Sequence, residues 1–362
     1  RSTKTILQAA SAVVMNNERR KAKVLWSDNE EGEKIEFSAL DDAYAEAAFV
    51  ARKIIESKFQ GIELGEMAVF YRINFQSRVF EEACIRFQVP YEVVGALKFY
   101  DRAEIKDVLA YLKVIENPRD AVSLRRIINV PARKIGHITL EKLVTHGKHT
   151  MLSLYNVLKQ VDQVEGIAKK MKERISEFIN MMEGFRRKCV TMSLYEFVLM
   201  VVKDSTYLDS LDPEKSEKDY TRRKNVEELL ISIKDYCKQN PDATLNGYPA
   251  DVSLRSEIDE WEASAQRVSL MTLHNAKGLE FDTVFITGLE DGLIPHYKSK
   301  SELDQYEEER RLLYVGITRA RKKLFLTKAK QRPTLRGGLV YTTISPFFRE
   351  IPIDVMGSGL EI

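Results

Sequence analysis

Several polar residues with chemical potential lie in residues 268–296, VSLMTLHNAKGLEFDTVFITGLEDGLIPH. The first apolar run predicts a buried strand that ends at Thr272. The chain then turns through His274, Lys277 and Gly278. Polar groups at the carboxyl end of a strand, on a turn that contains glycine, are well placed to bind a ligand at the edge of a sheet. The same residues also fit an ordinary loop in which glycine adopts a positive φ, and both interpretations stay open on this segment alone.

A second group, rich in arginine, lies in residues 307–327, EEERRLLYVGITRARKKLFLT. Its apolar positions predict a packed helix, and Gly316 marks either the end of that helix or a close approach of another element. Thr318, Arg319 and Arg321 follow, just before a predicted strand. Because a guanidinium stays charged and binds oxygen atoms with two parallel hydrogen bonds, an arginine held here suits contact with a phosphate. A solvated basic turn is the alternative.

A local excess of positive charge lies in residues 98–134, which hold nine Lys and Arg against five Asp and Glu. The turn from Lys134 to Gly136, followed by Thr139 at an expected helix start, can direct backbone N–H groups and a hydroxyl at a phosphate of a nucleic-acid duplex. The excess favours a phosphate backbone as the partner. A solvated basic face is the alternative.

The sequence lacks several other kinds of site. No GxxxxGKS/T phosphate-binding loop is present, because the only Gly-Lys pair, Gly147-Lys148, has Lys142 in place of the first glycine. Three widely separated cysteines without CxxC spacing predict neither a zinc site nor a disulfide framework. His146 and His149 have no carboxylate or cysteine partner at ligand spacing, so no metal site is expected.

Composition sets broad bounds on the protein. Its 362 residues, 44% hydrophobic and 30% charged, supply two ordinary domain cores. A net charge of +2 means that any nucleic-acid surface must be a local patch. The N-terminal segment lacks the pattern of a signal peptide, and no stretch approaches the roughly 18 apolar residues of a membrane span. We therefore expect no membrane association. The isolated cysteines favour a reducing, cytoplasmic location.

The predicted elements change character along the chain. Residues 38–55 are predicted to form an amphipathic helix, with Ser38 and Asp41 arranged as a capping box. A strand at residues 67–71, a helix and a second short strand follow. Apolar spacings of three and four then predict helices over residues 103–266.

Strand signals return at Val268, in short apolar runs typical of a buried parallel sheet. The α/β signals thus bracket the helical ones, which indicates one discontinuous α/β domain that carries a helical insertion. Three consecutive small domains are the alternative. The stretch after Gln331 is expected to be irregular.

Two of these segments, residues 268–296 and 307–327, resemble motifs V and VI of superfamily 1 helicases of the UvrD, PcrA and Rep type almost residue for residue. The resemblance extends to MAVFYRINFQSRVFEEA, which is similar to the family's motif IV, and to FYDRAEIKDVLAYL just after it. The first residues, RSTKTILQAASAVV, look like the end of motif III. NVPARKIGHITLEKL, residues 129–143, is similar to the family's duplex-contacting helical hairpin.

This resemblance implies an α/β fold: a RecA-like parallel-sheet domain of the P-loop NTPase type, without the P-loop, interrupted by an all-α insertion. The motor domain called 2A would comprise residues 1–102 and 267–350. The helical 2B insertion would comprise residues 103–266, and a C-terminal tail residues 351–362.

The resemblance also implies the C-terminal half of an ATP-dependent 3′ to 5′ DNA helicase that acts in repair or replication. ATP with Mg²⁺ would bind between two motor domains of the intact enzyme. The first motor domain (1A with 1B) is expected to precede Arg1, so the chain alone is expected neither to bind ATP tightly nor to hydrolyse it. Expected partners are single-stranded DNA, single/double-strand junctions, the first motor domain, and repair or replication proteins.

For the nucleotide, the resemblance assigns five residues. Arg319 resembles the motif VI arginine that reaches the γ-phosphate as an arginine finger. Arg1 looks like the motif III arginine with a similar role. Glu280 resembles the motif V glutamate that accepts hydrogen bonds from the ribose, and Lys277 and Gly278 of the same motif are assigned to the same site.

For the single strand, Arg72 and Asn74, together with Thr272 and His274, look like the family's contacts. A motor that advances along any sequence must hold phosphates and stack bases rather than read base edges. As alternatives, Asn74 caps the following helix and His274 is a buried histidine.

For the duplex, the resemblance assigns Lys134, Gly136 and Thr139, with Lys134 in place of the first glycine of the family's usual GIG. Two alternatives to a helicase motor remain. One is a stand-alone, non-catalytic module, derived from a helicase, that binds DNA or a partner. The other is a nuclease-linked relative, which no carboxylate-rich motif supports.

Overall fold

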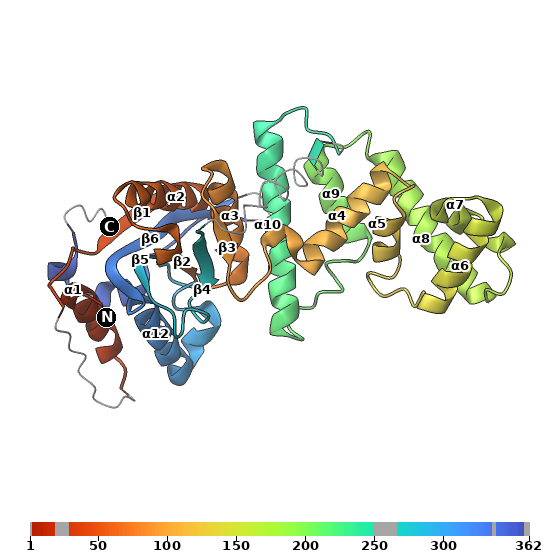
Figure 1. Ribbon diagram of the computed structural model, residues 1–362. Coiled ribbons are helices and arrows are strands. Elements are labelled where there is room, and N and C mark those ends of the chain that lie inside the picture. Colours follow the sequence, from red (N-terminus) through yellow and green to blue (C-terminus); the bar gives the residue numbers. More distant parts are fainter. Residues whose placement is uncertain (1, 19–28, 246, 249–265, 335–337, 358–362) are drawn as a thin grey trace. The chain divides into compact units, whose positions relative to one another are not determined.

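Strands from both ends of the chain form one seven-stranded sheet (Figure 1). The computed structural model describes residues 2–18, 29–245, 247–248, 266–334 and 338–357. The strands are β1 (Glu36–Asp42), β2 (Met67–Tyr71), β3 (Tyr91–Val93), β4 (Val268–Thr272), β5 (Phe281–Ile286), β6 (Ala320–Pro333) and β7 (Leu339–Tyr341). Their order is β1-β6-β5-β2-β4-β3 with parallel pairing throughout, and β7 pairs antiparallel with β6. The predicted α/β class with a parallel sheet is confirmed.

The chain divides into two compact units. Unit 1 comprises Arg1–Phe99 and Ile258–Ile362, and unit 2 comprises Tyr100–Glu257. The sheet belongs to unit 1, so the two sequence segments that show strand signals build one body.

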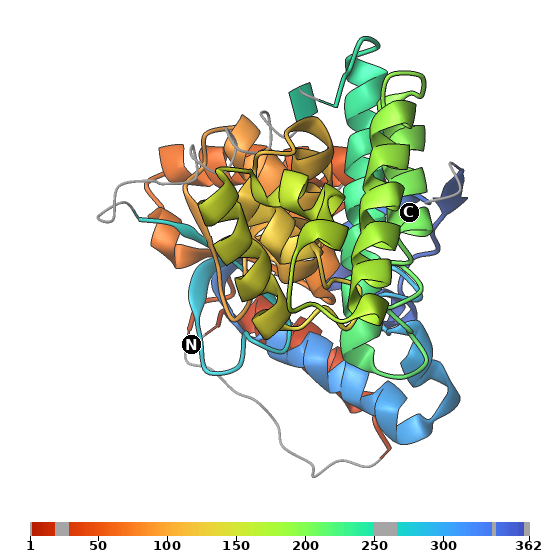
Figure 2. The same cartoon turned by 90° about the vertical axis from the view of Figure 1, so that its right-hand side faces the viewer.

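Helices cover both faces of the sheet. They are α1 (Lys4–Met15), α2 (Ala43–Phe59), α3 (Ser77–Arg86) and α12 (Leu303–Ile317). Val69 and Tyr71 of β2 pack with α2 and α3, whereas the alternate residues Ala68 and Phe70 pack with α1 and α12. The two pairs of helices lie on opposite sides of the sheet in Figure 1 and in Figure 2. Burial on both faces explains why β2 reads as a continuous apolar run.

The predicted helix over residues 38–55 is wrong in its first part. Residues Glu36–Asp42 form the edge strand β1, and α2 starts directly after it. Asp42 rather than Ser38 caps the helix, because its Oδ1 accepts N–H bonds of 2.9 and 2.8 Å from the second and third helical residues. The strand forms by parallel pairing with β6, a partner far away in the sequence that local spacing does not reveal.

The expectation of irregular structure after Gln331 is also partly wrong. Strand β6 continues to Pro333, and β7 returns antiparallel to it. All three residues of β7 are exposed, so no pattern of alternating burial marks this strand in the sequence. Phe347 and Phe348, in the short helical turn that follows, pack with α1 and α12.

Every described element of unit 2 is helical. Its α-helices are α4 (Ala103–Glu116), α5 (Ala121–Ile127), α6 (His137–Thr150), α7 (Leu154–Lys159), α8 (Lys169–Lys188), α9 (Leu194–Asp204) and α10 (Glu217–Gln239). In α9 the residues Leu194, Phe197, Val198 and Val201 are buried, at the spacing that places apolar side chains on one helix face. In the described parts of both units, no helix is long and apolar enough to cross a membrane.

Candidate functional site

Residues 273–280 cross the sheet rather than forming a single turn at one edge. Strands β4 and β5 both run parallel to β2, so the chain leaves β4 where the parallel strands end and enters β5 where they begin. We call these the carboxyl edge and the amino edge. Thr272 and His274 therefore belong to the carboxyl edge, whereas Glu280 lies at the amino edge. The expectation that all of this segment's polar groups gather at the carboxyl ends of strands is wrong, because the segment begins at the carboxyl edge and ends at the amino edge.

Arg319 lies at the amino edge, in the turn between α12 and β6. Its Nη1 donates to the Leu279 carbonyl at 3.1 Å, its Nε to the Val315 carbonyl at 3.1 Å, and its Nη2 to Thr318 Oγ1 at 3.2 Å. These acceptors are neutral, and no carboxylate of the described residues pairs with this guanidinium. Arg319 is thus fixed to the carbonyl of the residue before Glu280 and forms no ion pair among the described residues, an arrangement that suits an anionic ligand.

The crossing segment presents exposed residues to the same edge. Lys277, Gly278 and Glu280 are all exposed. Gly278 has a φ of +88°, and no atom lies within 4 Å of the position that a Cβ would take. Glycine is therefore needed there for backbone conformation rather than for space, as the loop interpretation expects. The open space beside it leaves room for a ligand.

The other arginine of the turn is already bound. Nε of Arg321 donates to Asp282 Oδ1 at 2.8 Å, and its Nη2 binds Glu66. Ser2 Oγ donates to the Thr318 carbonyl at 3.3 Å, so the start of the described chain lies beside this turn. Arg1, which the sequence assigns to the γ-phosphate, lies outside the described residues.

Gly316 marks a close approach within α12 and not the end of the helix, which continues to Ile317. A Cβ at this position would lie 2.4 Å from Cδ2 of Leu273. Leu273 is the first residue of the crossing segment, so α12 packs directly on it. The two elements that run from one edge of the sheet to the other are in contact here.

Arg72 follows β2 at the carboxyl edge, and Glu309 of α12 binds its guanidinium. Nη2 lies 2.5 Å from Oε1, and Nε lies 2.9 Å from Oε2. The exposed fraction is 16% for the Arg72 side chain and 6% for Glu309. Burial alone would raise the pKa of Glu309, but the hydrogen bonds and charge of Arg72 outweigh it and lower that pKa. The sequence gives no sign of this pair, because its members come from distant segments.

Both alternatives that the sequence leaves for the other carboxyl-edge residues are wrong. Asn74 does not cap α3, whose first turn has no side-chain cap, and Asn74 Oδ1 is buried without a hydrogen-bond partner among the described residues. His274 is exposed rather than buried, and Thr272, at the end of β4, is 7% exposed. Gln76 fixes the backbone, since its Oε1 accepts the N–H groups of residues 72 and 73 at 3.1 and 3.0 Å.

In unit 2, Lys134 adopts the backbone conformation that glycine usually takes. Its φ is +62°, so the lysine at the position of the first glycine of GIG adopts a left-handed conformation. Asn129 Oδ1 accepts N–H bonds from Arg133 and Ile135 at 2.8 and 3.1 Å and thereby holds the turn. Gly136 is the N-cap of α6, without a side-chain cap, and Lys134 is exposed. Backbone N–H groups at this helix start are available to an anion.

Thr139 is the third residue of α6, in its first turn, and is partly exposed. Farther along α6, His146 and His149 line a pocket of about 590 Å³. Across the described residues, no three His, Cys, Asp or Glu side chains gather as ligands of a metal would.

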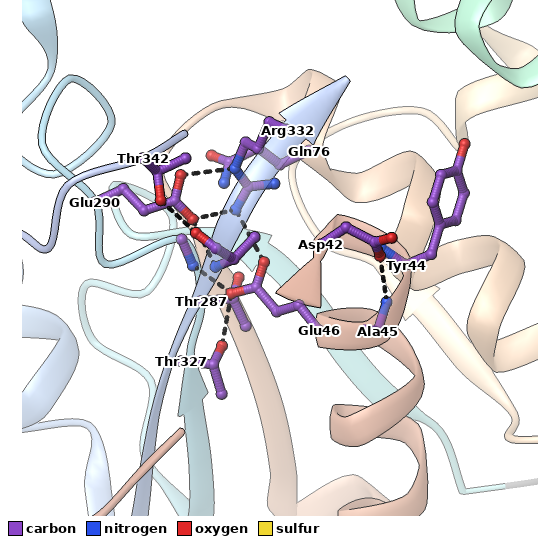
Figure 3. A network of polar contacts seen from close by, with 12 residues as sticks. Asp42, Tyr44, Ala45, Glu46, Gln76, Thr287, Glu290, Thr327, Arg332 and Thr342 are labelled. Atoms are coloured by element: carbon purple, nitrogen blue, oxygen red, sulfur yellow. Dashed lines mark hydrogen bonds and ion pairs between the residues drawn. The ribbon is translucent and has the colours of Figure 1, made fainter. Parts of the chain in front are cut away.

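A buried ionic network that sequence reasoning missed lies between α2, β6 and the loop after β5 (Figure 3). Nη2 of Arg332 lies 2.9 Å from Glu46 Oε2 and 2.7 Å from Glu290 Oε1. The exposed fraction is 0% for Glu46, 2% for Glu290 and 22% for Arg332. Glu46 Oε1 also accepts the Thr327 hydroxyl at 2.7 Å and the Gly288 N–H at 2.8 Å. The network fixes the loop that begins at the carboxyl edge.

Burial is the main cause of the shift at Glu46 and raises the pKa of this carboxyl, although the nearby charge of Arg332 opposes it. For Arg332, burial alone would lower the pKa, but the two carboxylates outweigh it and raise that pKa. The arginine therefore stays charged and pairs directly with both buried acids.

Comparison with known proteins identifies relatives over nearly the whole chain. The family model of the UvrD-like helicase C-terminal domain matches residues 1–331. The ATP-dependent DNA helicase PcrA of Bacillus subtilis (strain 168) is 41% identical over 363 residues, covering 98% of this chain and 49% of the relative. PcrA of Staphylococcus aureus (strain Mu50) is 40% identical over 360 residues, again 98% and 49%. The chain thus spans about half the length of these curated relatives. It belongs to the family of UvrD-like helicase C-terminal domains.

Proposed function

We propose that the chain is the C-terminal motor and DNA-binding portion of an ATP-dependent 3′ to 5′ DNA helicase. In this proposal residues 1–102 and 267–350 form the RecA-like domain 2A, residues 103–266 form an all-helical 2B insertion, and residues 351–362 form a tail. The observation that carries the proposal is the Arg319 guanidinium, which is fixed to the carbonyl of the residue before Glu280 and forms no ion pair among the described residues, in a chain that belongs to a helicase family.

At the amino edge, Arg319 contacts the γ-phosphate and neutralises charge that develops there. Glu280 accepts hydrogen bonds from the ribose, and Lys277 and Gly278 line the same wall. ATP with Mg²⁺ supplies the phosphoryl group whose hydrolysis drives the motor. Exposure of these residues and the open space beside Gly278 fit such a ligand.

The opposite wall must come from another domain, because the sequence contains no GxxxxGKS/T loop to hold the phosphates. We assign that wall to a first motor domain (1A with 1B) and Arg1 to the junction with it. The chain alone is therefore expected neither to hold ATP tightly nor to hydrolyse it.

At the carboxyl edge, Arg72, Asn74, Thr272 and His274 hold single-stranded DNA. Phosphate contacts and base stacking serve a motor that must bind any sequence. In unit 2, the turn that contains Lys134 holds the duplex side of a single/double-strand junction, with backbone N–H groups at the start of α6 directed at a phosphate. Repair or replication proteins are the expected protein partners.

Two elements connect these edges, the crossing segment 273–280 and α12, and they touch at Gly316 and Leu273. When the two motor domains close on ATP, the nucleotide contacts Arg319, and the crossing segment and α12 move together. This movement changes how tightly the carboxyl edge binds the strand. Hydrolysis reverses the closure, so alternate tight and loose holding by two motor domains gives one-way steps.

Substitution of Arg72 tests the DNA-binding part of this proposal. Arg72→Ala removes one phosphate contact, so it is expected to weaken the binding of fluorescent oligothymidylate about fourfold and to reduce the salt slope by about 0.7. Fluorescence anisotropy at several salt concentrations measures both quantities. Arg86→Ala, which removes an exposed arginine from the last turn of α3, is the matched control and should bind as the parent chain does. Equal affinity of the two variants would remove Arg72 from the DNA site.

A further inference from the structure

Glu309 is held more firmly than a simple surface ion pair requires. Besides the three bonds from Arg72, it accepts the N–H of His296 at 3.0 Å and the hydroxyl of Ser299 at 3.3 Å. Its side chain is 6% exposed. These contacts fix both carboxylate oxygens of Glu309. The carboxylate therefore binds Arg72 in a single orientation.

The Arg72 guanidinium has a further hydrogen-bond donor that Glu309 does not use. Its Nε and Nη2 face Glu309, whereas Nη1 has no acceptor among the described residues. The Arg72 side chain is 16% exposed, so solvent reaches part of it. One side of the guanidinium is thus anchored, and Nη1 on the other side remains able to donate a hydrogen bond.

The backbone beneath this side chain is anchored as well. Gln76 Oε1 accepts the N–H groups of Arg72 and Ile73, directly after β2 ends. An arginine usually loses much rotamer freedom when it binds a ligand. Here most of that freedom is already lost in the folded chain, so the outward donors are pre-organised for an anion.

We propose that Glu309 is a positioning residue for DNA binding: it holds Arg72 so that Nη1 faces a phosphate of the single strand. This inference rests on the proposed DNA-binding function of the carboxyl edge. The charge of Glu309 does not repel the strand in this arrangement, because Arg72 neutralises it at 2.5 Å. The lowered pKa of Glu309 keeps the carboxylate ionised near neutral pH.

The chain offers a matched control on the same helix. Arg310, the next residue, forms a similar two-bond pair with Glu350, with Nη2–Oε1 at 2.9 Å and exposed fractions of 8% and 17%. Nη1 of Arg310 donates to Asn17, so this guanidinium is bound on both sides. Glu350→Gln therefore removes a comparable buried charge without changing an outward donor.

The test measures anisotropy of fluorescent oligothymidylate with the full 362-residue chain as parent, Arg72→Ala, Glu309→Gln, the double variant and Glu350→Gln. Glu309→Gln is expected to weaken binding about threefold, because Arg72 regains its rotamers. The double variant should bind no more weakly than Arg72→Ala, since Glu309 acts only through Arg72. Glu350→Gln should bind as the parent does.

If Glu309→Gln lowers the melting temperature more than Glu350→Gln does, the loss of binding could reflect loss of stability. The same substitution is then also made in the Arg72→Lys variant. Arg72→Lys retains a charge but cannot be held by two parallel bonds. In that background Glu309→Gln is expected to cause no further loss of affinity. A purely structural role would instead weaken binding equally in both backgrounds.

The outcomes separate the inference from the function on which it rests. If the parent chain shows no salt-dependent binding, the proposed DNA-binding function fails and the inference fails with it. If Arg72→Ala weakens binding but Glu309→Gln binds as well as the parent, or more tightly, only the positioning role is overturned. An additive loss in the double variant overturns it too.

Discussion

Replacing Arg319 with alanine is expected to lower the rate of ATP hydrolysis by the chain joined to a first motor domain about 10³- to 10⁵-fold, the range typical of an arginine finger. The chain places this guanidinium beside Glu280 and fixes it on three neutral oxygen atoms, so its charge remains available to the transferring phosphoryl group. Affinity for single-stranded DNA should not change, because Arg319 lies at the amino edge. Phosphate release measured with and without single-stranded DNA gives the rate, and anisotropy gives the affinity.

Arg321→Ala is the matched control for this prediction. Arg321 lies two residues away, but its guanidinium is already paired with Asp282 and Glu66. Its loss should therefore leave turnover within about tenfold of the parent, far above that of Arg319→Ala. Normal turnover in Arg319→Ala would exclude Arg319 from the nucleotide site.

The second large effect concerns stability. Arg332→Ala is expected to lower the free energy of unfolding by about 3–5 kcal/mol, the usual cost of leaving a buried charge without its partner. The substitution leaves Glu46 and Glu290 buried without their shared cation. Urea unfolding followed by circular dichroism measures the loss. Lys330→Ala removes a cation of the same strand that is 52% exposed and pairs with Asp41, which is 82% exposed, so it should cost no more than about 1 kcal/mol.

The stability of Arg332→Ala should also depend on pH. Burial already raises the pKa of Glu46 above its ordinary value, so the folded state binds more protons than the unfolded state. Stability then increases as the pH falls through the raised pKa. Part of the loss should be recovered at about pH 5, because protonation removes a buried charge. A loss that is independent of pH, or below 1 kcal/mol, would show that this network is not the buried charge cluster described.

Parts of this fold could be predicted from local sequence because burial leaves a local pattern. Strands β2 and β4 are covered on both faces, so each appears as a continuous apolar run. Strand β1 lies at an edge and its residues 38–42 mimic the start of a helix, so only its pairing with β6 reveals it. Strand β7 is exposed and has no apolar alternation to recognise.

The residues of the candidate site also divide into those that a local sequence pattern reveals and those that it does not. Thr272 and Arg319 could be chosen from the sequence because strands and helices flank them closely. Glu309 could not, since its partner Arg72 lies 237 residues away and no local rule relates the two. Lys134 is a further example: the sequence marks a departure from GIG, but only the structure shows that this lysine adopts a positive φ.

The central claim is that Arg319 and Glu280 line one wall of an ATP site whose other wall belongs to a first motor domain. The most direct test compares phosphate release, with single-stranded DNA present, by the chain alone and by the chain joined to a first motor domain of the same family. Background release is expected from the chain alone, and DNA-stimulated release from the joined protein. DNA-stimulated hydrolysis by the chain alone would contradict it, as would a joined protein that binds DNA yet never hydrolyses ATP.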